Sequence, residues 1–566
     1  MNILGINFTD FHESSACLLQ DGKVVFACAE ERLSRVKQDK KFPLLAIKAA
    51  LDFAGLTPGE VDHVAFSFPL SWEFYRHNLK LMLAGTWGIS SVRAQRWVLG
   101  FLKGQRHRGG ELDYVRAFGK PKGGVYHINH HLAHALSSYC MSGFEQASVL
   151  VIDGRGTYEA TTLWHARGGE LKLLETYEFP NSLGVFYAGI TEMLGFEPFS
   201  DEWKVMGLAA YGKPSHDLTR LIRSNAETYS VDGRRFFGKD DCDRNGLEEV
   251  TGPCRLETEE LSAQHQNLAR SAQDACEQAM LALLKRITKL TGCRKLCLAG
   301  GVALNCKANG ELLRSGLIDD IYVQPAAGDD GTCIGAALGV YQELGLPLPR
   351  IPTGHSYLGH EFSNEAIEKV LKVYKLPYQR VENASRTAAE LLAQNHLVGW
   401  FQGRMEFGPR ALGNRSILSD PRRAGNRDRV NEAVKFRESW RPFAPSVLEE
   451  KAHLYFHDFK PSPYMILSFW ANKTRAQEIP AVVHVDGSCR VQSVDRVTNP
   501  RYYGLLQEFE KLTGVPVVMN TSFNLKGDPI VCSPKDAVQT FYTSGLDDLV
   551  IGSFLVSKNA NTLFGP

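Results

Sequence analysis

Residues 147–179 read ASVLVIDGRGTYEATTLWHARGGELKLLETYEF, and residues 3–31 read ILGINFTDFHESSACLLQDGKVVFACAEE. Each stretch has an apolar run, a polar loop, a second apolar run, a tight turn with glycine and a third run. That order is typical of three strands joined by hairpins. The two copies lie about 145 residues apart, a period too long for a solenoid. The pattern indicates an α/β domain with a duplicated half.

A third element follows the second copy. Residues 295–316, KLCLAGGVALNCKANGELLRSG, combine an apolar strand, the pair Gly300–Gly301 and a helical pattern. Glycines let the backbone approach a ligand closely, and the free N–H groups at a helix start favour phosphate. In this order the three elements resemble the actin/hexokinase-like ATPase superfamily, in which the hairpin loop of each half faces nucleotide phosphates.

Composition narrows the class of protein. A chain of 566 residues predicts two or three domains, and 44% hydrophobic with 22% charged residues is typical of a globular protein. The net charge of +1 gives no global attraction to nucleic acid or to an anionic membrane, so we expect neither as a partner. The 12 cysteines form no CxxC pairs, which favours reduced thiols.

The N-terminal sequence predicts no export signal. MNILGINFTD lacks a basic segment followed by a long apolar one, and no run of about 20 apolar residues occurs that could span a membrane. We therefore expect a cytoplasmic protein, with a homodimer as a possible assembly.

Prolines and glycines cluster in residues 343–357, which marks a domain edge. Beyond it a helical pattern, NEAIEKVLKVY, leads to the strand candidates HLVGWFQG and GVPVVMN. The sequence therefore predicts a first domain at 1–350 and a second α/β domain at 356–566.

Four histidines lie in residues 127–139, HINHHLAHALSSY. On a helix His130 and His134 share one face, while Leu136 and Tyr139 can pack elsewhere. The alternative is a polar helix face with satisfied histidines. Asp153 and Asp329 each follow an apolar strand, although either alone could be a loop or capping residue. Two histidines and two aspartates together would suit Fe²⁺, Mn²⁺ or Zn²⁺, with open positions for phosphate oxygens.

Arginines gather in the second domain. Residues 399–418 carry Arg404, Arg410 and Arg415, and the stretch VKFRESWRPF adds Lys435, Arg437 and Arg441; Arg490 follows in DGSCRVQSV. A solvated basic face is the simple interpretation. However, the neighbours are Gly, Pro, Trp and Phe, which suit a structured pocket, and arginine forks match phosphate oxygens.

Five motifs carry a more specific resemblance: HHLAHA, LVIDGRG, KVMGLAAYG, LAGGVALN and the GDDG loop. They resemble those of the ATP-dependent O-carbamoyltransferases, the family of the tobramycin, cephamycin and nodulation-factor carbamoyltransferases. The likeness runs from FHESSA near the N-terminus to NTSFNLKGDPIV near the end. It implies a duplicated actin/hexokinase-like ATPase domain fused to a YrdC-like α/β domain, and a role in antibiotic or natural-product biosynthesis.

The resemblance also implies site residues. In the first domain it implies His130, His134, Asp153 and Asp329 as metal ligands, with iron foremost and Mg²⁺ possible with ATP. It implies nucleotide contacts at Asp153, Gly154, Gly156, Gly300, Gly301 and Asn305. In the second domain it implies contacts to carbamoyl phosphate and ATP from Arg410, Lys435, Arg441, Arg490, Asn520 and Ser522. Lys37 matches a family lysine that reaches this site, but RVKQDKKFP departs from the usual lysine–histidine pattern.

The implied reaction has two steps. The second domain converts carbamoyl phosphate and ATP into carbamoyl adenylate, and the first domain transfers the carbamoyl group to a hydroxyl of a small-molecule acceptor. We expect His12, in the first hairpin loop, to act in the transfer, since imidazole titrates near neutral pH. Without the resemblance, a loop histidine bonded to backbone would be preferred.

Other functions remain open. A threonylcarbamoyl-tRNA-type enzyme uses both domain types, but the near-zero net charge favours a small acceptor. A sugar kinase would not need the second, arginine-rich domain, and the hydrogenase-maturation relative carries cysteine pairs that this chain lacks. A non-transferring ATP-binding scaffold would bind nucleotide without releasing pyrophosphate.

Residues 70–125 are the least family-like part of the first domain, aromatic and basic with helical spacing. The pattern favours an amphipathic helical layer on the core. A wall for an anionic or glycosidic acceptor and a nucleic-acid surface are the alternatives. Residues 215–260 are polar and could border the same cleft. The acceptor is not identified by either segment.

Overall fold

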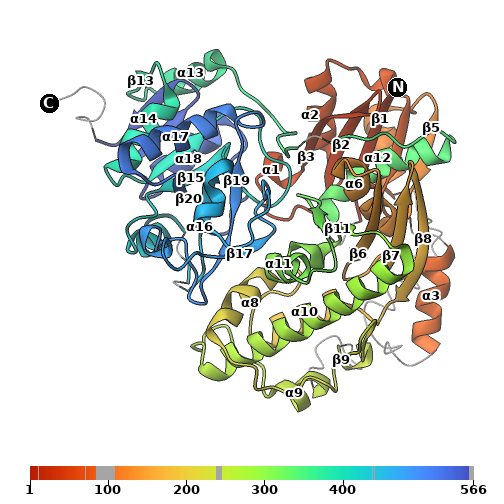
Figure 1. Ribbon diagram of the computed structural model, residues 1–566. Helices are drawn as coiled ribbons and strands as arrows, with labels where there is room; N and C mark the ends of the chain where they lie inside the picture. The colour runs from red at the N-terminus through yellow and green to blue at the C-terminus, as the bar shows by residue number, and fades with distance from the viewer. Residues whose placement is uncertain are drawn as a thin grey trace. The chain divides into compact units, whose positions relative to one another are not determined.

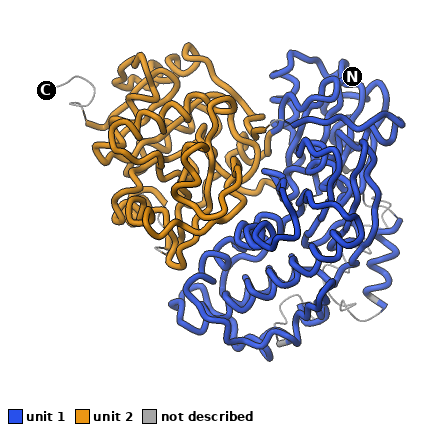
Figure 2. Tube along the Cα trace, in the orientation of Figure 1, with its two compact units in different colours: residues 1–27, 40–352 blue, residues 28–39, 353–566 orange. Residues whose placement is uncertain are grey.

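The computed structural model describes residues 1–9, 12–69, 72–83, 109–236, 245–352, 354–435, 437–438 and 440–559 (Figure 1). The chain divides into two compact units (Figure 2). Unit 1 comprises residues 1–27 and 40–352, and unit 2 comprises residues 28–39 and 353–566. The short segment 28–39, which follows the first hairpin in sequence, is thus part of unit 2.

Two five-stranded sheets repeat one strand order in unit 1. The first sheet runs β3 (Lys23–Ala29), β2 (Ser15–Gln20), β1 (Asn2–Asn7), β4 (His63–Phe66), β5 (Gly124–His127). The second runs β8 (Glu170–Glu178), β7 (Glu159–Arg167), β6 (Gln146–Ile152), β11 (Lys295–Ala299), β12 (Asp320–Val323). In both sheets the central strand, β1 or β6, pairs antiparallel with the strand that follows it in sequence and parallel with the strand on its other side. The predicted duplication is confirmed.

Two helices lie between these sheets. α12 (Thr332–Glu343) packs on β1, β2 and β4, whereas α6 (His130–Ser142) packs on β6, β11 and α12 (Figure 1). The helices cross so closely that a Cβ on Gly335 would lie 1.7 Å from the Ala133 carbonyl oxygen. Because α6 is covered on both sides, its histidine face is buried as well as the face of Leu136 and Tyr139.

Other helices cover the outside of unit 1. The 29-residue α10 (Ala263–Thr291) contacts α7 (Leu183–Met193), α8 (Glu202–Leu208), α11 (Cys306–Arg314) and the hairpin of β9 (Ile222–Ser224) and β10 (Tyr229–Val231). The remaining helices are α2 (Leu44–Ala54), α3 (Trp72–Leu83), α5 (Gly109–Phe118) and α9 (Asn245–Thr251). Of the expected amphipathic layer at 70–125, α3 and α5 are helical, while residues 84–108 lie outside the described residues.

Unit 2 is built on an eight-stranded mixed sheet. Its order is β13 (Gln379–Arg380), β22 (Phe554–Ser557), β21 (Asp548–Ile551), β14 (Val398–Phe401), β15 (Arg415–Ser419), β20 (Val517–Ser522), β16 (Ala444–Leu448), β19 (Gln492–Val494). The predicted strands HLVGWFQG and GVPVVMN are β14 and β20. Two short strands, β17 (Ser468–Trp470) and β18 (Ser488–Arg490), form a separate two-stranded sheet.

The core of unit 2 lies between this sheet and two helices that pack on each other, α14 (Ala384–Ala393) and α17 (Pro500–Thr513). Trp400 and Phe509 are fully buried there. α18 (Pro534–Tyr542) packs on β14 and β21, and the predicted helix at 364–374 is α13 (Asn364–Val373). The α/β fold class is therefore confirmed for both units.

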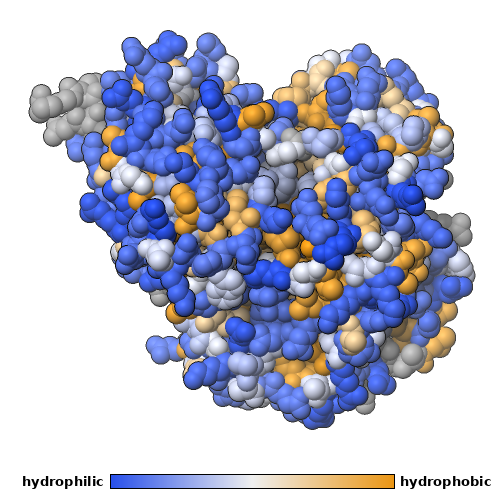
Figure 3. Space-filling model, in the orientation of Figure 1, coloured by the Kyte–Doolittle hydropathy of each residue, from blue (hydrophilic) through white to orange (hydrophobic). Residues whose placement is uncertain are grey.

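The described helices include none whose length and apolar character would allow it to cross a lipid bilayer. In the view of Figure 3, hydrophilic residues cover most of the visible surface of each unit, and hydrophobic residues are scattered between them. This mixture is ordinary for a globular surface.

Candidate metal centre and active site

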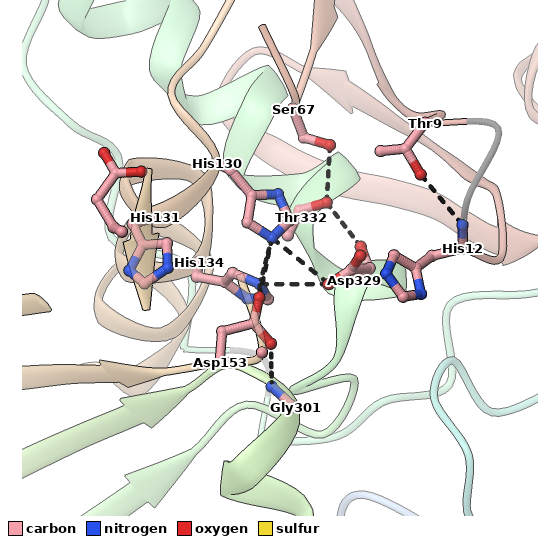
Figure 4. Close-up of polar contacts among 12 residues, drawn as sticks. Thr9, His12, Ser67, His130, His131, His134, Asp153, Gly301, Asp329 and Thr332 are labelled. Carbon is pink, nitrogen blue, oxygen red and sulfur yellow. Dashed lines mark hydrogen bonds and ion pairs between the residues drawn. The ribbon is translucent and has the colours of Figure 1, made fainter. Parts of the chain in front are cut away.

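The two histidines and two aspartates singled out in the sequence meet inside unit 1 (Figure 4). His130 and His134 lie in the first turns of α6, which begins where Asn129 accepts a hydrogen bond from Leu132 N at 3.0 Å. Asp153 follows β6, and Asp329 opens the short turn before α12. The duplicated topology brings the end of a strand and the start of each central helix to one point.

The distances among the four side chains suit a shared ion. His130 Nε2 lies 3.2 Å from both Asp153 Oδ2 and His134 Nε2, and 3.5 Å from Asp329 Oδ1. His134 Nε2 lies 3.8 Å from Asp153 Oδ2 and 3.7 Å from Asp329 Oδ1. With bonds of about 2.1 Å, neighbouring ligands of one ion stand roughly 3.0–3.4 Å apart. The donor atoms need to move only by tenths of an ångström to share an ion.

Electrostatics in the cluster also favour a cation. Both histidines are fully buried. Burial lowers the pKa of His130, but the Asp329 and Asp153 carboxylates outweigh it and raise that pKa to about 10. Burial likewise opposes ionisation of Asp153, yet the hydrogen bond from His130 holds its pKa well below the usual range. Two carboxylates and two imidazole nitrogens fit a borderline divalent ion in chemistry as well as in distance.

Further contacts hold the four ligands in place. Gly301 N–H donates to Asp153 Oδ1 at 3.0 Å, and Thr332 Oγ1 donates to the Asp329 carbonyl at 2.6 Å. Gly300 has φ +91°, and a Cβ there would lie 2.2 Å from the Ile152 carbonyl oxygen. The glycine pair therefore serves to bring the 300–301 backbone against Asp153, a candidate metal ligand. Such outer contacts fix ligand orientation.

Among the other nucleotide-site candidates of unit 1, two glycines lie next to this cluster and one asparagine makes structural hydrogen bonds. Gly154 and Gly156 lie in the loop directly after Asp153, where Gly156 N–H donates to the Glu159 carbonyl at 2.7 Å. Asn305 caps α11 by accepting from Ala308 N at 3.1 Å and exchanges hydrogen bonds with Gln273. Its side chain has a structural role in addition to any ligand contact.

His12 lies beside the cluster. Its backbone N–H donates to Thr9 Oγ1 at 3.2 Å, and its imidazole lies beside Asp329 (Figure 4). Burial raises the pKa of Asp329, but His130 first, and then His134 and His12, hold that pKa well below its usual value. The half-buried imidazole of the first hairpin loop thus faces the ligands supplied by the second half.

Phe199 is a site neighbour that the sequence did not indicate. Its ring lies 6.2 Å from the His12 ring, edge to face, and 54% of the residue is exposed. Its φ of +62° is unusual for a bulky residue, and its N–H donates to Glu202 Oε1 at 2.6 Å. Only the aromatic residue in a Pro- and Gly-containing loop, GFEPFSDE, could have drawn attention to it.

Unit 2 contains a second polar cluster, of basic residues. Lys435 Nζ donates to Ser522 O at 2.6 Å and to Asn524 Oδ1 at 2.8 Å. Burial, then Arg437 and Arg441, hold the pKa of Lys435 well below its usual value. Burial, then Arg441 and Arg490, do the same for the pKa of Arg437. The structure therefore brings together Lys435, Arg441 and Arg490, and it adds Arg437, to which the sequence had given no role.

The remaining candidates of unit 2 have different surroundings. Asn520 is buried and donates to Ser446 Oγ and Gln492 Oε1 at 3.1 and 3.0 Å, whereas Ser522 contacts Lys435 Nζ. Arg410 is half-buried in a loop whose backbone is held by Glu406 Oε1. Lys37 is exposed on the 28–39 segment.

Two of the arginines quoted from residues 399–418 are structural. Arg404 donates to the Leu358 carbonyl at 2.6 Å. Arg415 is buried, donates to the Gln402 carbonyl at 2.6 Å and has its guanidinium 3.7 Å from the centre of the Phe401 ring. Both side chains hold loops together.

Two family profiles match this chain. The one described as Carbamoyltransferase N-terminus matches residues 2–78 and 97–338, and the one described as Carbamoyltransferase C-terminus matches residues 389–558. The first covers the four candidate metal ligands and the second covers the basic cluster.

Curated relatives cover nearly the whole chain. The nodulation protein NolNO of Sinorhizobium fredii is 40% identical over 570 residues, 98% of this chain and 80% of that protein. The nodulation protein NolO of Bradyrhizobium diazoefficiens is 44% identical over 443 residues, 77% of this chain and 80% of that protein.

Among solved structures, full-length HypF in its phosphate- and nucleotide-bound form is similar at 12% identity and a TM-score of 0.33, over 61% of this chain and 55% of that one. This likeness is too weak to support an argument about function. Because the two profiles together match most of the chain and the two relatives are 40% and 44% identical to it, the chain belongs to the carbamoyltransferase family.

Proposed function

We propose that this protein is an O-carbamoyltransferase that uses carbamoyl phosphate and ATP, forms carbamoyl adenylate in unit 2 and carbamoylates a hydroxyl of a small acceptor in unit 1. Family membership supports the transfer of a carbamoyl group. The observation that carries the finer proposal is the presence in one chain of two unlike clusters: buried His and Asp ligands in unit 1, and like-charged Lys435, Arg437, Arg441 and Arg490 in unit 2.

The first step suits the basic cluster. Water cleaves carbamoyl phosphate into carbamate and phosphate, and a carbamate oxygen then attacks the α-phosphorus of ATP. The bond from that phosphorus to the β-phosphate oxygen breaks, and pyrophosphate leaves. The four cationic side chains repel one another, so phosphate groups that relieve this repulsion bind well, and developing negative charge is stabilised.

The second step suits unit 1. The acceptor oxygen attacks the carbamoyl carbon, the bond to the AMP oxygen breaks, and AMP leaves. His12 takes the hydroxyl proton, because it lies beside the cluster and a ring nitrogen of imidazole can accept a proton. A divalent ion on His130, His134, Asp153 and Asp329 would supply positive charge to the phosphate oxygens of the nucleotide. The backbone at Gly154 and Gly301 would approach the same phosphate.

A small hydroxylated natural product is the acceptor class that we favour. The relatives named above are nodulation proteins, and the net charge of +1 offers no general attraction to tRNA. A threonylcarbamoyl-tRNA-type enzyme and a scaffold that binds ATP without transfer are the competing functions.

One assay tests the proposal. Purified protein is mixed with ATP and carbamoyl phosphate, and the products are identified. We expect pyrophosphate, formed only when carbamoyl phosphate is present. ADP formation that does not need carbamoyl phosphate would contradict the proposal and favour a kinase or ATPase, and nucleotide binding without any turnover would favour the scaffold.

A further inference from the structure

Unit 1 contains a cavity that the proposed mechanism does not use. Its volume is about 600 Å³, within the range of roughly 300–1,000 Å³ typical of small-molecule pockets. The lining comes from α3, from the corner after β8 at residues 178–181, from the β9–β10 hairpin and from residues 232–234. All of its lining residues belong to unit 1.

One side of the cavity can recognise hydroxyl groups. His77 is buried, and its Nε2 lies 2.9 Å from the Phe179 carbonyl oxygen. A carbonyl only accepts, so Nε2 carries the proton. Burial, then Arg155, lowers the pKa of His77, which favours the neutral ring with Nδ1 as an acceptor. Glu178 Oε2 is 3.8 Å from that nitrogen and offers a second acceptor.

The rim of the cavity is basic. Exposed Lys80, Arg220, Arg223 and Arg234 line it, against the acidic Glu178 and Asp232, which leaves a net formal charge of two positive. Three of these cations are ion-paired: Lys80 with Glu178, Arg234 with Asp232, and Arg220 with Glu249, which also pairs with Arg235. Arg223 donates to the Thr219 carbonyl at 2.9 Å, and no carboxylate of the described residues lies within ion-pair distance of it. Its guanidinium can therefore serve an anion without losing an ion pair.

The same wall holds the loop that carries the metal ligand Asp153. Phe179, Pro180 and Asn181 line the cavity, and the next residue, Ser182, contacts the carbonyl oxygens of Asp153 and Gly154 at 3.1 and 2.7 Å. The Arg155 guanidinium lies 4.5 Å from the centre of the Phe179 ring. A ligand in the cavity is thus separated from the candidate metal centre by one short stretch of chain.

We propose that this cavity binds the acceptor, and that the acceptor is a hydroxylated anion: a sugar-like molecule that carries a carboxylate or a phosphate. The inference that the bound molecule is the acceptor rests on the proposed function, whereas the inference that the cavity binds a hydroxylated anion does not. Polar acceptors on the inner wall select hydroxyl groups, and the basic rim selects the anion.

Binding is measured by calorimetry with the full-length protein and three probes. Digalacturonate carries carboxylates, UDP-glucose carries phosphates, and cellobiose is a neutral disaccharide. We expect at least one anionic probe to bind and cellobiose to bind at least about tenfold more weakly. The two anionic arms distinguish a carboxylate from a phosphate source. Failure of both anionic probes to bind, or equal binding of cellobiose, would overturn the proposal.

Charge variants locate the site. The double variant Arg223→Glu, Arg234→Glu should lower the affinity for the anionic probe by at least about tenfold, since two exposed positive charges that attract the anion become negative charges that repel it. Arg223→Lys, Arg234→Lys keeps the charges and should retain most of the binding. Arg294→Glu is the control, because Arg294 is exposed and is ion-paired with Asp319, as Arg234 is with Asp232, but does not line the cavity. Thermal unfolding of each variant checks that it is folded.

The outcomes separate this inference from the proposed function. Unchanged binding of the anion to the folded double Glu variant, or equal loss in Arg294→Glu, would overturn the cavity as the site. If the anion binds as expected but the protein releases no pyrophosphate from ATP and carbamoyl phosphate, the cavity remains an anion-binding site and the proposed carbamoyl chemistry is contradicted.

Discussion

The two polar clusters of this chain differ in how their charges are balanced. In unit 1, the buried His130 and His134 face Asp153 and Asp329, and opposite charges compensate one another. In unit 2, the buried Lys435 and the half-buried Arg437 lie beside Arg441 and Arg490, and like charges depress the pKa values of the first two after burial itself. One cluster is arranged as a set of ligands, the other as a receptor for anions.

The difference teaches how each cluster depends on its ligand. A mixed cluster can hold itself together by hydrogen bonds, and a cation replaces protons in it. A like-charged cluster stores repulsion that only an anion relieves, so it contributes to function at the expense of stability. Substitutions in the cluster of unit 2 should therefore lower activity far more than they lower the free energy of unfolding. Substitutions in the cluster of unit 1 should mainly lower the metal content.

The largest effect is expected from His12→Asn. Loss of the proton acceptor should slow carbamoyl transfer by about 10²–10⁴-fold, the usual contribution of a general base. Pyrophosphate release, which we assign to unit 2, should continue. The measurement is the appearance of carbamate product by mass spectrometry with a pool of hydroxylated acceptors. Normal product formation by this variant would remove His12 from the mechanism.

Lys435→Met should come next. Under the proposed function, removal of one cation from the basic cluster should slow pyrophosphate release by about 10²–10³-fold. The free energy of unfolding should fall by no more than about 1–3 kcal/mol, because the hydrogen bonds from Lys435 Nζ to Ser522 and Asn524 are lost while the repulsion from two arginines is relieved. Denaturant unfolding and pyrophosphate release are measured on the same sample. A variant that keeps its activity, or that loses activity only because it is unfolded, would contradict the account.

His130→Ala tests the mixed cluster. One of four ligands is lost, so the purified variant should contain far less metal than the parent protein when both are assayed by elemental analysis. His165→Ala is the control, since His165 on β7 is hydrogen-bonded to Gln146 on β6 and is not part of the cluster. Ser182→Ala removes the contacts to the Asp153 and Gly154 carbonyls as well as the N-cap of α7, and it should lower metal affinity by about 10–100-fold. Equal metal content in His130→Ala and the control would count against the centre.

The smallest effect is expected at Phe199. Asparagine tolerates its positive φ, so Phe199→Asn should raise the free energy of unfolding by about 1 kcal/mol. The lost ring contact with His12 should slow transfer about three- to tenfold. Phe199→Tyr keeps the ring and should keep the parent rate. Slower transfer in both variants, or in neither, would show that the ring does not position His12.

Local patterns predicted the parts of the fold that depend on periodicity. The hairpins, the strand before Gly300 and the pairing of His130 with His134 follow from spacings of two and four residues. Asp153 and Asp329 are far apart in sequence, and their meeting depends on the duplicated sheet order. Their places after apolar strands made them candidates to join the histidines, and the family resemblance implied the same set.

Other features have no local signal. The segment 28–39 is too short to show which unit it joins, although Arg35 donates to the Ile530 carbonyl of unit 2 at 2.6 Å. Arg415 and Arg437 look alike in sequence, yet the first is held by backbone carbonyls and the second lies among cations. The conformation of Phe199 depends on its loop and on Glu202, which periodicity does not describe.

The central claim is that the two chemical steps belong to different units, and carbamoyl adenylate itself tests it most directly. His12→Asn and Lys435→Met proteins are each mixed with ATP and carbamoyl phosphate without acceptor, and the adenylate is measured by mass spectrometry after rapid quenching. We predict that it forms with His12→Asn and is absent with Lys435→Met. Adenylate formed by Lys435→Met but not by His12→Asn would contradict the division of labour.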